Sequence, residues 1–184
     1  METKPVSKTT SLAMTAVMSA VICVLSPFAI PIGPVPITLS VFAILLAVYV
    51  LGWKRGSVSC LVYILLGMVG APVFSNFSGG LSKLAGPTGG YIVGYIPMAI
   101  VAGLILERWD SRVVQALGMA LSVAVLYAFG TVWFCMLTGK TVAAALAVCV
   151  TPFIPGSVVK IAGVLIVGPM ICAGLKAANI DPRA

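Results

Sequence analysis

Long apolar segments without a charged side chain are the feature that most limits what this chain can become. Residues 38–52, 89–106 and 113–137 contain no Lys, Arg, Asp or Glu. The chain of 184 residues is 61% hydrophobic and 8% charged, whereas a soluble domain has about 25% charged residues. A helix of about 20 apolar residues crosses the hydrocarbon core of a bilayer. The sequence therefore predicts an all-α integral membrane protein that lies in the lipid bilayer.

Six transmembrane helices follow from the positions where Gly, Pro or charged clusters interrupt the apolar segments. Residues 52–56 and 107–112 carry charges beside a tryptophan, which is typical of a membrane interface. Residues 141–150 are apolar but too short to span as a helix, so we expect a partial or interfacial helix there. The chain length favours a single domain, residues 1–184. The predicted spans are residues 10–28, 38–52, 57–70, 89–106, 113–137 and 157–178.

Basic residues are distributed unevenly between the two ends of these helices. Six spans put both termini on one side, and eight of the eleven Lys and Arg residues fall on that side. The positive-inside rule places it in the cytoplasm. The net charge of +7 thus follows from topology, and no nucleic-acid partner is required. The eight residues are Lys4, Lys8, Lys54, Arg55, Arg108, Arg112, Lys176 and Arg183.

Residues 71–95 differ from the plain helices around them, because they combine many glycines with two prolines and several polar groups. A helix is expected to begin at Gly89 with Thr88 as its N-cap. Irregular backbone at membrane depth must line a cavity or pack against protein, so this stretch is a candidate binding site. An alternative stays open, because three glycines follow the four-residue spacing of close helix packing: Gly86, Gly90 and Gly94.

Small residues form two rows on the first predicted helix. Small residues at a spacing of four suit close contact with another helix. That helix can belong to this chain or to a partner, and the sequence does not decide between them. One row holds Ala16 and Ala20, and the other holds Ser11, Thr15, Ser19 and Cys23.

Metal and acid–base chemistry is not expected within the spans. The chain has no histidine, and none of its four acidic residues lies inside an apolar segment. The usual metal ligands and general acids or bases are therefore missing from the membrane interior. The five cysteines have no ligand-like spacing and are interpreted as small buried side chains. No cofactor is predicted.

Lys160 is a charged residue well inside a predicted span, three residues past Ser157 in the expected first turn of the last helix. A helix N-terminus and a cation both favour an anion, and no acidic residue in the spans can pair with it. A ligand carboxylate is a candidate partner, and a lysine that snorkels to the interface is the alternative. Asn76, Tyr91 and Tyr95 add polar groups near the irregular stretch, and an amide suits a ureido ligand because it both donates and accepts.

The segments Gly-Pro-Thr-Gly-Gly-Tyr at 86–91 and Pro-Phe-Ile-Pro-Gly at 152–156, followed by Lys160, resemble the BioY family. BioY proteins are the biotin-binding substrate components (S components) of energy-coupling factor (ECF) transporters. The resemblance covers essentially the whole chain. It implies the six-helix ECF S-component bundle in a bacterial cell membrane with cytoplasmic termini. It also implies high-affinity capture of biotin from outside, and no enzyme activity.

The resemblance also implies partners and site residues. Ala16 and Ala20 would dock on a transmembrane coupling protein, which two ATP-binding subunits serve. Asn76 matches the asparagine of the family's loop between helices 3 and 4, and Lys160 matches its helix-6 lysine. The expected ligand-binding residues are Asn76, Gly89, Gly90, Tyr91, Ser157 and Lys160.

One position departs from the family pattern, since Ser157 stands where the family usually has aspartate. A serine hydroxyl accepts a hydrogen bond but cannot neutralise Lys160. An S component for a related small carboxylate vitamin and a solitary biotin permease therefore stay open as alternatives. A membrane-embedded enzyme is disfavoured because no base lies beside a nucleophile. A structural subunit is disfavoured by the outward irregular loops, and a secondary transporter by the absence of a repeated architecture.

Overall fold

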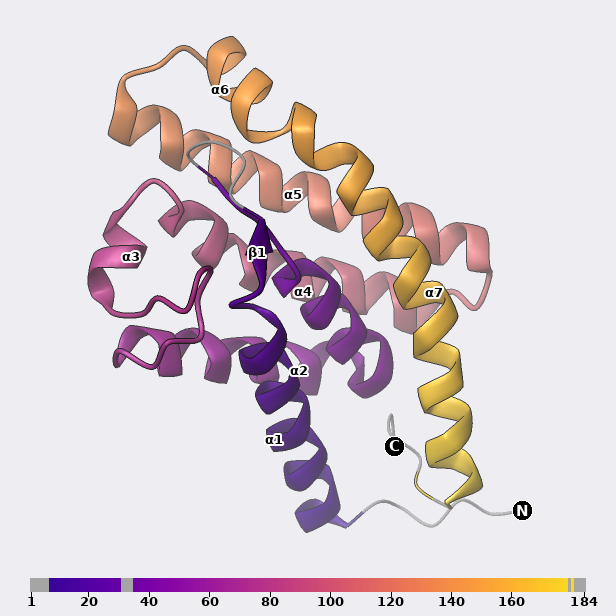
Figure 1. Cartoon of the computed structure of the whole chain (residues 1–184). Coiled ribbons are helices and arrows are strands. Elements are labelled where there is room, and N and C mark those ends of the chain that lie inside the picture. The colour runs from indigo at the N-terminus through magenta and orange to yellow at the C-terminus, as the bar shows by residue number, and fades with distance from the viewer. Residues whose placement is uncertain (1–6, 31–34, 179, 181–184) are drawn as a thin grey trace.

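The computed structural model describes residues 7–30, 35–178 and 180 and is almost entirely helical (Figure 1). A short antiparallel hairpin and three short helical pieces interrupt the long helices. The long helices are α1 (Lys8–Leu25), α2 (Ser40–Met68), α4 (Gly89–Arg108), α5 (Arg112–Thr138) and α7 (Ile154–Ala177). The short elements are β1 (Ala29–Ile30), β2 (Ile37–Thr38), α3 (Leu81–Ala85), α6 (Val142–Cys149) and the 3₁₀ turn η1 (Thr151–Phe153).

The α2 segment is two helices joined at a sharp break. Gly52 adopts φ 81° and ψ 176°, a conformation open to glycine and closed to most other residues. The second half folds back past the first, since a Cβ at Gly56 would lie 2.6 Å from the Cα of Val48. We expected two separate helices here, at 38–52 and 57–70, and the structure has the break at Gly52 inside α2. Counted with α2 as one segment, the described residues hold five helices long and apolar enough to span a membrane, and the break divides α2 to give six helical segments.

A carboxylate from another helix caps this break. The Glu107 side chain reaches from the end of α4 and accepts a hydrogen bond from the Trp53 backbone N–H at 2.7 Å. That N–H belongs to the first turn of a helix and has no partner within its own segment. Glu107 therefore ties the end of α4 to the middle of the α2 hairpin.

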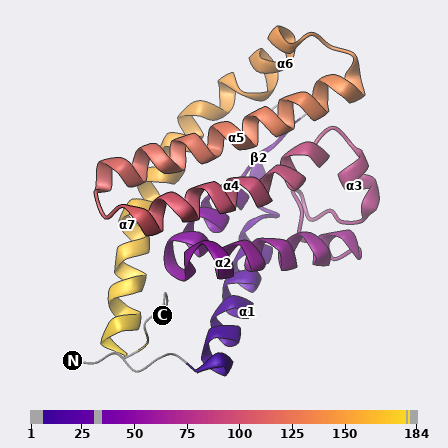
Figure 2. The same cartoon turned by 180° about the vertical axis from the view of Figure 1, so that it is seen from behind.

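Glycines bring α4 and α5 into close antiparallel contact (Figure 2). A Cβ at Gly90 would meet the Trp133 side chain, and one at Gly130 would meet the Tyr91 ring. A Cβ at Gly94 would lie 3.1 Å from the α5 side chains beside it. The close-packing interpretation of the glycine spacing is thus realised for Gly90 and Gly94.

The two rows on α1 face different surroundings. Thr15 and Ser19 are buried against α2, where the Ser59 hydroxyl donates to the Thr15 carbonyl at 3.0 Å. Ala16 and Ala20, in the neighbouring row, are exposed. The polar row therefore packs inside this chain, while the alanine row remains on the surface.

The last helix begins earlier than the sequence prediction. We expected a start near Ser157, but η1 leads directly into α7 at Ile154. Pro155 lies in the first turn of α7, where its missing N–H costs no hydrogen bond. Lys160 is consequently in the second turn, and the helix dipole acts on it more weakly than the sequence suggested.

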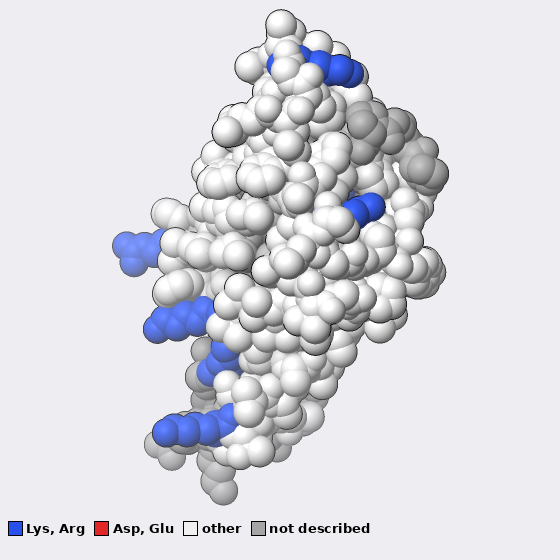
Figure 3. All heavy atoms as spheres, turned by 90° about the vertical axis from the view of Figure 1, so that its left-hand side faces the viewer, with Lys and Arg blue, Asp and Glu red and all other residues white. Residues whose placement is uncertain are grey.

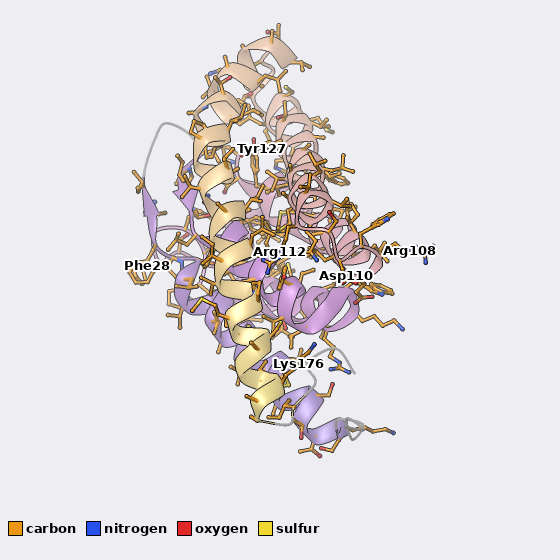
Figure 4. The ribbon with its side chains drawn as sticks, turned by 90° about the vertical axis from the view of Figure 1, so that its right-hand side faces the viewer. Phe28, Arg108, Asp110, Arg112, Tyr127 and Lys176 are labelled. Carbon is orange, nitrogen blue, oxygen red and sulfur yellow. The ribbon has the colours of Figure 1, made fainter. Side chains whose placement is uncertain are left out.

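A second proline in α7 is compensated by an arginine. Pro169 lies inside the helix and cannot donate to the carbonyl of Leu165 four residues earlier. Arg112, at the start of α5, donates to that carbonyl at 2.6 Å. Figure 4 shows Arg112 at the boundary between α5 and α7, whereas Arg108 projects away from the bundle.

The first turn of α1 and the last turn of α7 lie at the same end of the molecule in both ribbon views (Figures 1 and 2). Figure 3 shows several Lys and Arg side chains along one edge of the molecule, beside a broad uncharged surface. This arrangement is that of a multi-pass membrane protein with its charges near the ends of the helices.

Candidate ligand-binding site

A small cavity lies where the β hairpin, the start of α2, the loop after α2 and the start of α4 meet. We call it the hydroxyl cavity, because seven of its eleven lining residues carry a hydroxyl group. These seven are Thr38, Ser40, Tyr63, Ser75, Thr88, Tyr91 and Tyr95, and the others are Val35, Pro36, Phe74 and Ile92. Its volume of 30 Å³ is room for about two water molecules. A drug-sized ligand usually occupies about 300–1,000 Å³, so such a ligand requires the lining to move.

The aromatic floor of this cavity is firmly packed. The Tyr63 ring lies edge-on to Phe74 at 5.6 Å and tilted to Tyr95 at 6.4 Å. Phe74 is buried and fits against Gly67, where no Cβ could be accommodated. The Ser40 side chain is close to both the Tyr63 and the Tyr95 hydroxyl. The inner wall is therefore rigid, and adjustment has to come from the outer connections.

The outer wall includes a strained loop whose tip contacts the connection after α1. Asn76 and Phe77 have positive φ values of 58° and 53°, which is uncommon for asparagine and more so for phenylalanine. The Asn76 N–H donates to the Pro27 carbonyl at 3.0 Å, and the Phe77 ring contacts Phe28 edge-on at 5.7 Å. This loop, whose residues Phe74 and Ser75 line the cavity, is thus attached to the connection after α1.

The expected ligand-binding residues do not all reach the cavity. Tyr91 lines it, and its hydroxyl donates to the Cys149 carbonyl at 3.2 Å, which connects α4 to α6. Asn76 is exposed on the loop outside the cavity. Gly89 and Gly90 are buried in contacts with the Leu84 backbone and Trp133. Their direct contact with a ligand stays a prediction, and the geometry gives them a packing role.

Ser157 and Lys160 lie on the inward side of α7, one turn apart. Ser157 is 7% exposed, and its hydroxyl shares a hydrogen bond of 2.6 Å with the Tyr127 hydroxyl of α5. Lys160 is half-buried. Within the part of the chain that the structure describes, no hydrogen bond or ion pair reaches its ammonium group. Ser157 is thus engaged with a neighbour, while Lys160 has no partner among the residues that the structure describes.

The N-cap expected at Thr88 takes a different form. The helix α4 begins at Gly89 as predicted, but the Thr88 side chain makes no capping hydrogen bond. Its backbone is in the right-handed helical region, φ −89° and ψ −6°, whereas a capping side chain normally accompanies extended backbone. Thr88 lines the hydroxyl cavity instead.

Sequence reasoning missed most of the hydroxyl-bearing lining. Ser40 and Tyr63 line the cavity and lie inside predicted spans, while Tyr127, the partner of Ser157, lies in the middle of α5. Hydroxyl groups inside apolar segments could have indicated these residues, because a buried hydroxyl needs a hydrogen-bond partner. Their presence in the sequence does not tell which of these groups face one another, since that depends on how the helices pack.

The model of the BioY family matches residues 1–177 of this chain. The chain belongs to the BioY family. It is 37% identical over 165 residues to the biotin transporter BioY of Thermotoga maritima, covering 90% of this chain and 95% of that protein. It is 38% identical over 160 residues to the probable biotin transporter BioY of Pyrococcus horikoshii, covering 87% and 94%.

The fold of this BioY family member also matches a solved structure. The crystal structure of the S-component for biotin from an ECF-type ABC transporter superposes with a TM-score of 0.83 at 26% identity. The match covers 89% of this chain and 91% of the solved chain. The six-helix S-component bundle expected from the sequence is therefore confirmed.

Proposed function

We propose that this chain is the biotin-binding substrate component of an ECF-type uptake transporter in a bacterial cell membrane. The single observation that carries the proposal is the hydroxyl cavity between the β hairpin, α2 and α4. The half-buried Lys160 of α7 adds to it, because its ammonium group has no partner among the described residues. The printed names of the relatives and of the structural neighbour support biotin as the ligand. A transport component, rather than an enzyme, fits a membrane interior without acid–base pairs.

The ligand chemistry follows from the groups around the cavity. Tyrosine and serine hydroxyls both donate and accept hydrogen bonds, so they suit the ureido ring of biotin. Lys160 is suited to an anion or a carbonyl oxygen, since an ammonium group only donates. Ser157 holds Tyr127 in place and leaves Lys160 without a neighbouring carboxylate.

Entry of biotin requires the outer connections to move, because the closed cavity is far smaller than the ligand. The loop around Asn76 and Phe77 is the candidate, since it carries the positive φ values and few hydrogen bonds hold it to the connection after α1. Release of backbone strain at these two residues would offset part of the cost of opening.

The partner side of the proposal rests on α1. Its alanine row, Ala16 and Ala20, is exposed and apolar, which suits close contact with a transmembrane coupling protein. Two ATP-binding subunits would then supply the energy, and the termini would lie in the cytoplasm. A solitary biotin permease is the alternative, and uptake by cells that lack the coupling protein would favour it.

The test is binding of labelled biotin to the purified protein, compared with Lys160→Met. This change keeps most of the apolar stem and removes the charge. A charge-assisted hydrogen bond contributes about 1.5–3 kcal/mol, so we expect affinity to fall at least about tenfold. Lys140→Met is the matched control, because Lys140 is exposed and lies over the Phe134 ring, and it should bind as the original chain does.

Biotin amide distinguishes the two ends of the ligand. If Lys160 meets the carboxylate, the mutation should weaken biotin much more than the amide. If it donates to the ureido oxygen, both ligands should lose affinity equally. Unchanged binding of both ligands to Lys160→Met would show that the lysine only reaches toward the interface, and it would overturn this site. Tighter binding of another carboxylate vitamin would overturn biotin as the ligand.

A further inference from the structure

The hydroxyl of Ser157 differs from several other helix hydroxyls in the partner that it takes. Thr15, Ser19 and Thr138 each donate to the carbonyl four residues earlier in their own helix, at 2.9, 2.8 and 2.7 Å. Such a bond satisfies the donor within one helix. The Ser157 hydroxyl instead shares a hydrogen bond of 2.6 Å with the Tyr127 hydroxyl of α5. Its orientation therefore depends on a residue of another helix.

The direction of this hydrogen bond follows from the chemistry of the two groups. Each hydroxyl is able to donate or to accept,. A phenol is a stronger acid than an aliphatic alcohol, and its oxygen is the weaker acceptor because a lone pair is delocalised into the ring. Tyr127 is therefore the better donor and Ser157 the better acceptor. With Tyr127 donating, the O–H of Ser157 needs a different acceptor.

The Ser157 O–H is left without an acceptor among the residues that the structure describes. Its hydroxyl makes no other hydrogen bond there than the one with Tyr127. Ser157 is only 7% exposed, so water has little access to it. A buried donor without an acceptor costs free energy. A ligand oxygen at this place would remove that cost, so the site favours a ligand that supplies an acceptor.

The Tyr127–Ser157 pair lies near the hydroxyl cavity. The Tyr127 hydroxyl is close enough to those of Tyr91 and Tyr95 for an electrostatic interaction, and both of these residues line the cavity. Lys160 follows Ser157 by one turn and is half-buried. An ammonium group forms its strongest hydrogen bonds with a carboxylate, which leaves the neutral O–H of Ser157 for a neutral acceptor such as a urea oxygen.

We propose that Tyr127 is a positioning residue, which donates to Ser157 and thereby directs the serine O–H to the ureido oxygen of the ligand. This inference rests on the proposed function, because it takes biotin as the ligand. It gives Tyr127 a role in specificity besides that of holding α5 against α7. The site then selects a ligand that carries an oxygen, and not an N–H group, at that position.

The test compares the binding of biotin and of iminobiotin to the purified full chain in detergent. Iminobiotin carries a nitrogen in place of the ureido oxygen, and its protonated form at neutral pH only donates there. The measured quantity is the dissociation constant of iminobiotin divided by that of biotin. Tyr127→Phe keeps the ring and lets the serine hydroxyl rotate and accept. The ratio should therefore fall by about fivefold, the typical effect of one neutral hydrogen bond.

Two further variants separate positioning from packing. Arg112→Met also removes a hydrogen bond between α5 and α7, the one to the Leu165 carbonyl, and should leave the ratio unchanged because Arg112 lies at the start of α5. Ser157→Ala removes the donor itself and should lower the ratio by a similar factor to Tyr127→Phe. Adding Tyr127→Phe to Ser157→Ala should then lower the ratio no further.

Three outcomes would overturn the proposal. An unchanged ratio in Tyr127→Phe would show a merely structural residue, since loosened packing weakens both ligands equally. An equal fall in Arg112→Met would show that any loss of contact between α5 and α7 alters the ratio. A further fall in the double variant would show that Tyr127 contacts the ligand directly. Absence of biotin binding to the original chain would overturn the proposed function itself, whereas tight biotin binding with an unchanged ratio overturns only the role of Tyr127.

Discussion

The hydrogen bond from Arg112 to the Leu165 carbonyl gives a prediction whose magnitude follows from the structure. Pro169 removes the donor that would normally satisfy that carbonyl, and the guanidinium replaces it at 2.6 Å. A hydrogen bond from a charged group contributes about 1.5–3 kcal/mol. We therefore expect Arg112→Met to lower the free energy of unfolding by about 2 kcal/mol. The melting temperature of a chain of this size should then fall by about 4–8 °C.

The assay is thermal unfolding of the purified protein in detergent as a double-mutant cycle with Pro169→Ala. Alanine restores the N–H donor to the Leu165 carbonyl, so Arg112→Met should cost no more than about 0.5 kcal/mol in that background. Arg108→Met is the control, because it removes the same charge from an exposed residue. An equal cost of Arg112→Met with and without Pro169 would refute the reasoning, since it would show that the arginine stabilises something other than this carbonyl.

Three further predictions concern other parts of the chain. Gly130→Ala places a Cβ against the Tyr91 ring and should destabilise the fold by about 1–3 kcal/mol in thermal unfolding, whereas Gly174→Ala, which meets nothing within 4 Å, should be neutral; equal effects would contradict the packing argument. Ala16→Trp should block assembly with the coupling protein and leave biotin binding intact, and loss of binding with normal assembly would place this face inside the bundle. In a background without the native cysteines, Lys83→Cys should react with an impermeant maleimide from outside intact cells, and labelling only after lysis would reverse the proposed topology.

Helix positions were largely predictable because charge and glycine determine where an apolar segment stops. The break at Gly52 and the start of α4 at Gly89 agree with the structure. The predicted start of the last helix, residue 157, is too late, because that span was begun only after Pro155. A proline in the first turn is compatible with a helix, and composition does not distinguish the two cases.

The candidate site was predictable only where a residue stands out chemically. Lys160 is evident because a charge is rare in an apolar segment. Gly90 was ambiguous, because a small residue permits either ligand approach or helix contact, and only its neighbour Trp133 favours the second. How α2 folds back at Gly52 decides whether the side chains of Ser40, Tyr63 and Tyr95 come together around one cavity. No local sequence pattern encodes that packing.

The small volume of the hydroxyl cavity has a kinetic consequence. When a ligand can enter only after the site opens, association passes through a step whose rate does not depend on ligand concentration. The observed association rate should then level off as biotin increases, and the plateau equals the opening rate of the outer loop. The apparent dissociation constant rises as the open fraction falls. A mutation that relieves the backbone strain at Phe77, the residue with φ 53°, would shift the open fraction. It would alter the speed of capture without changing any atom that contacts the vitamin.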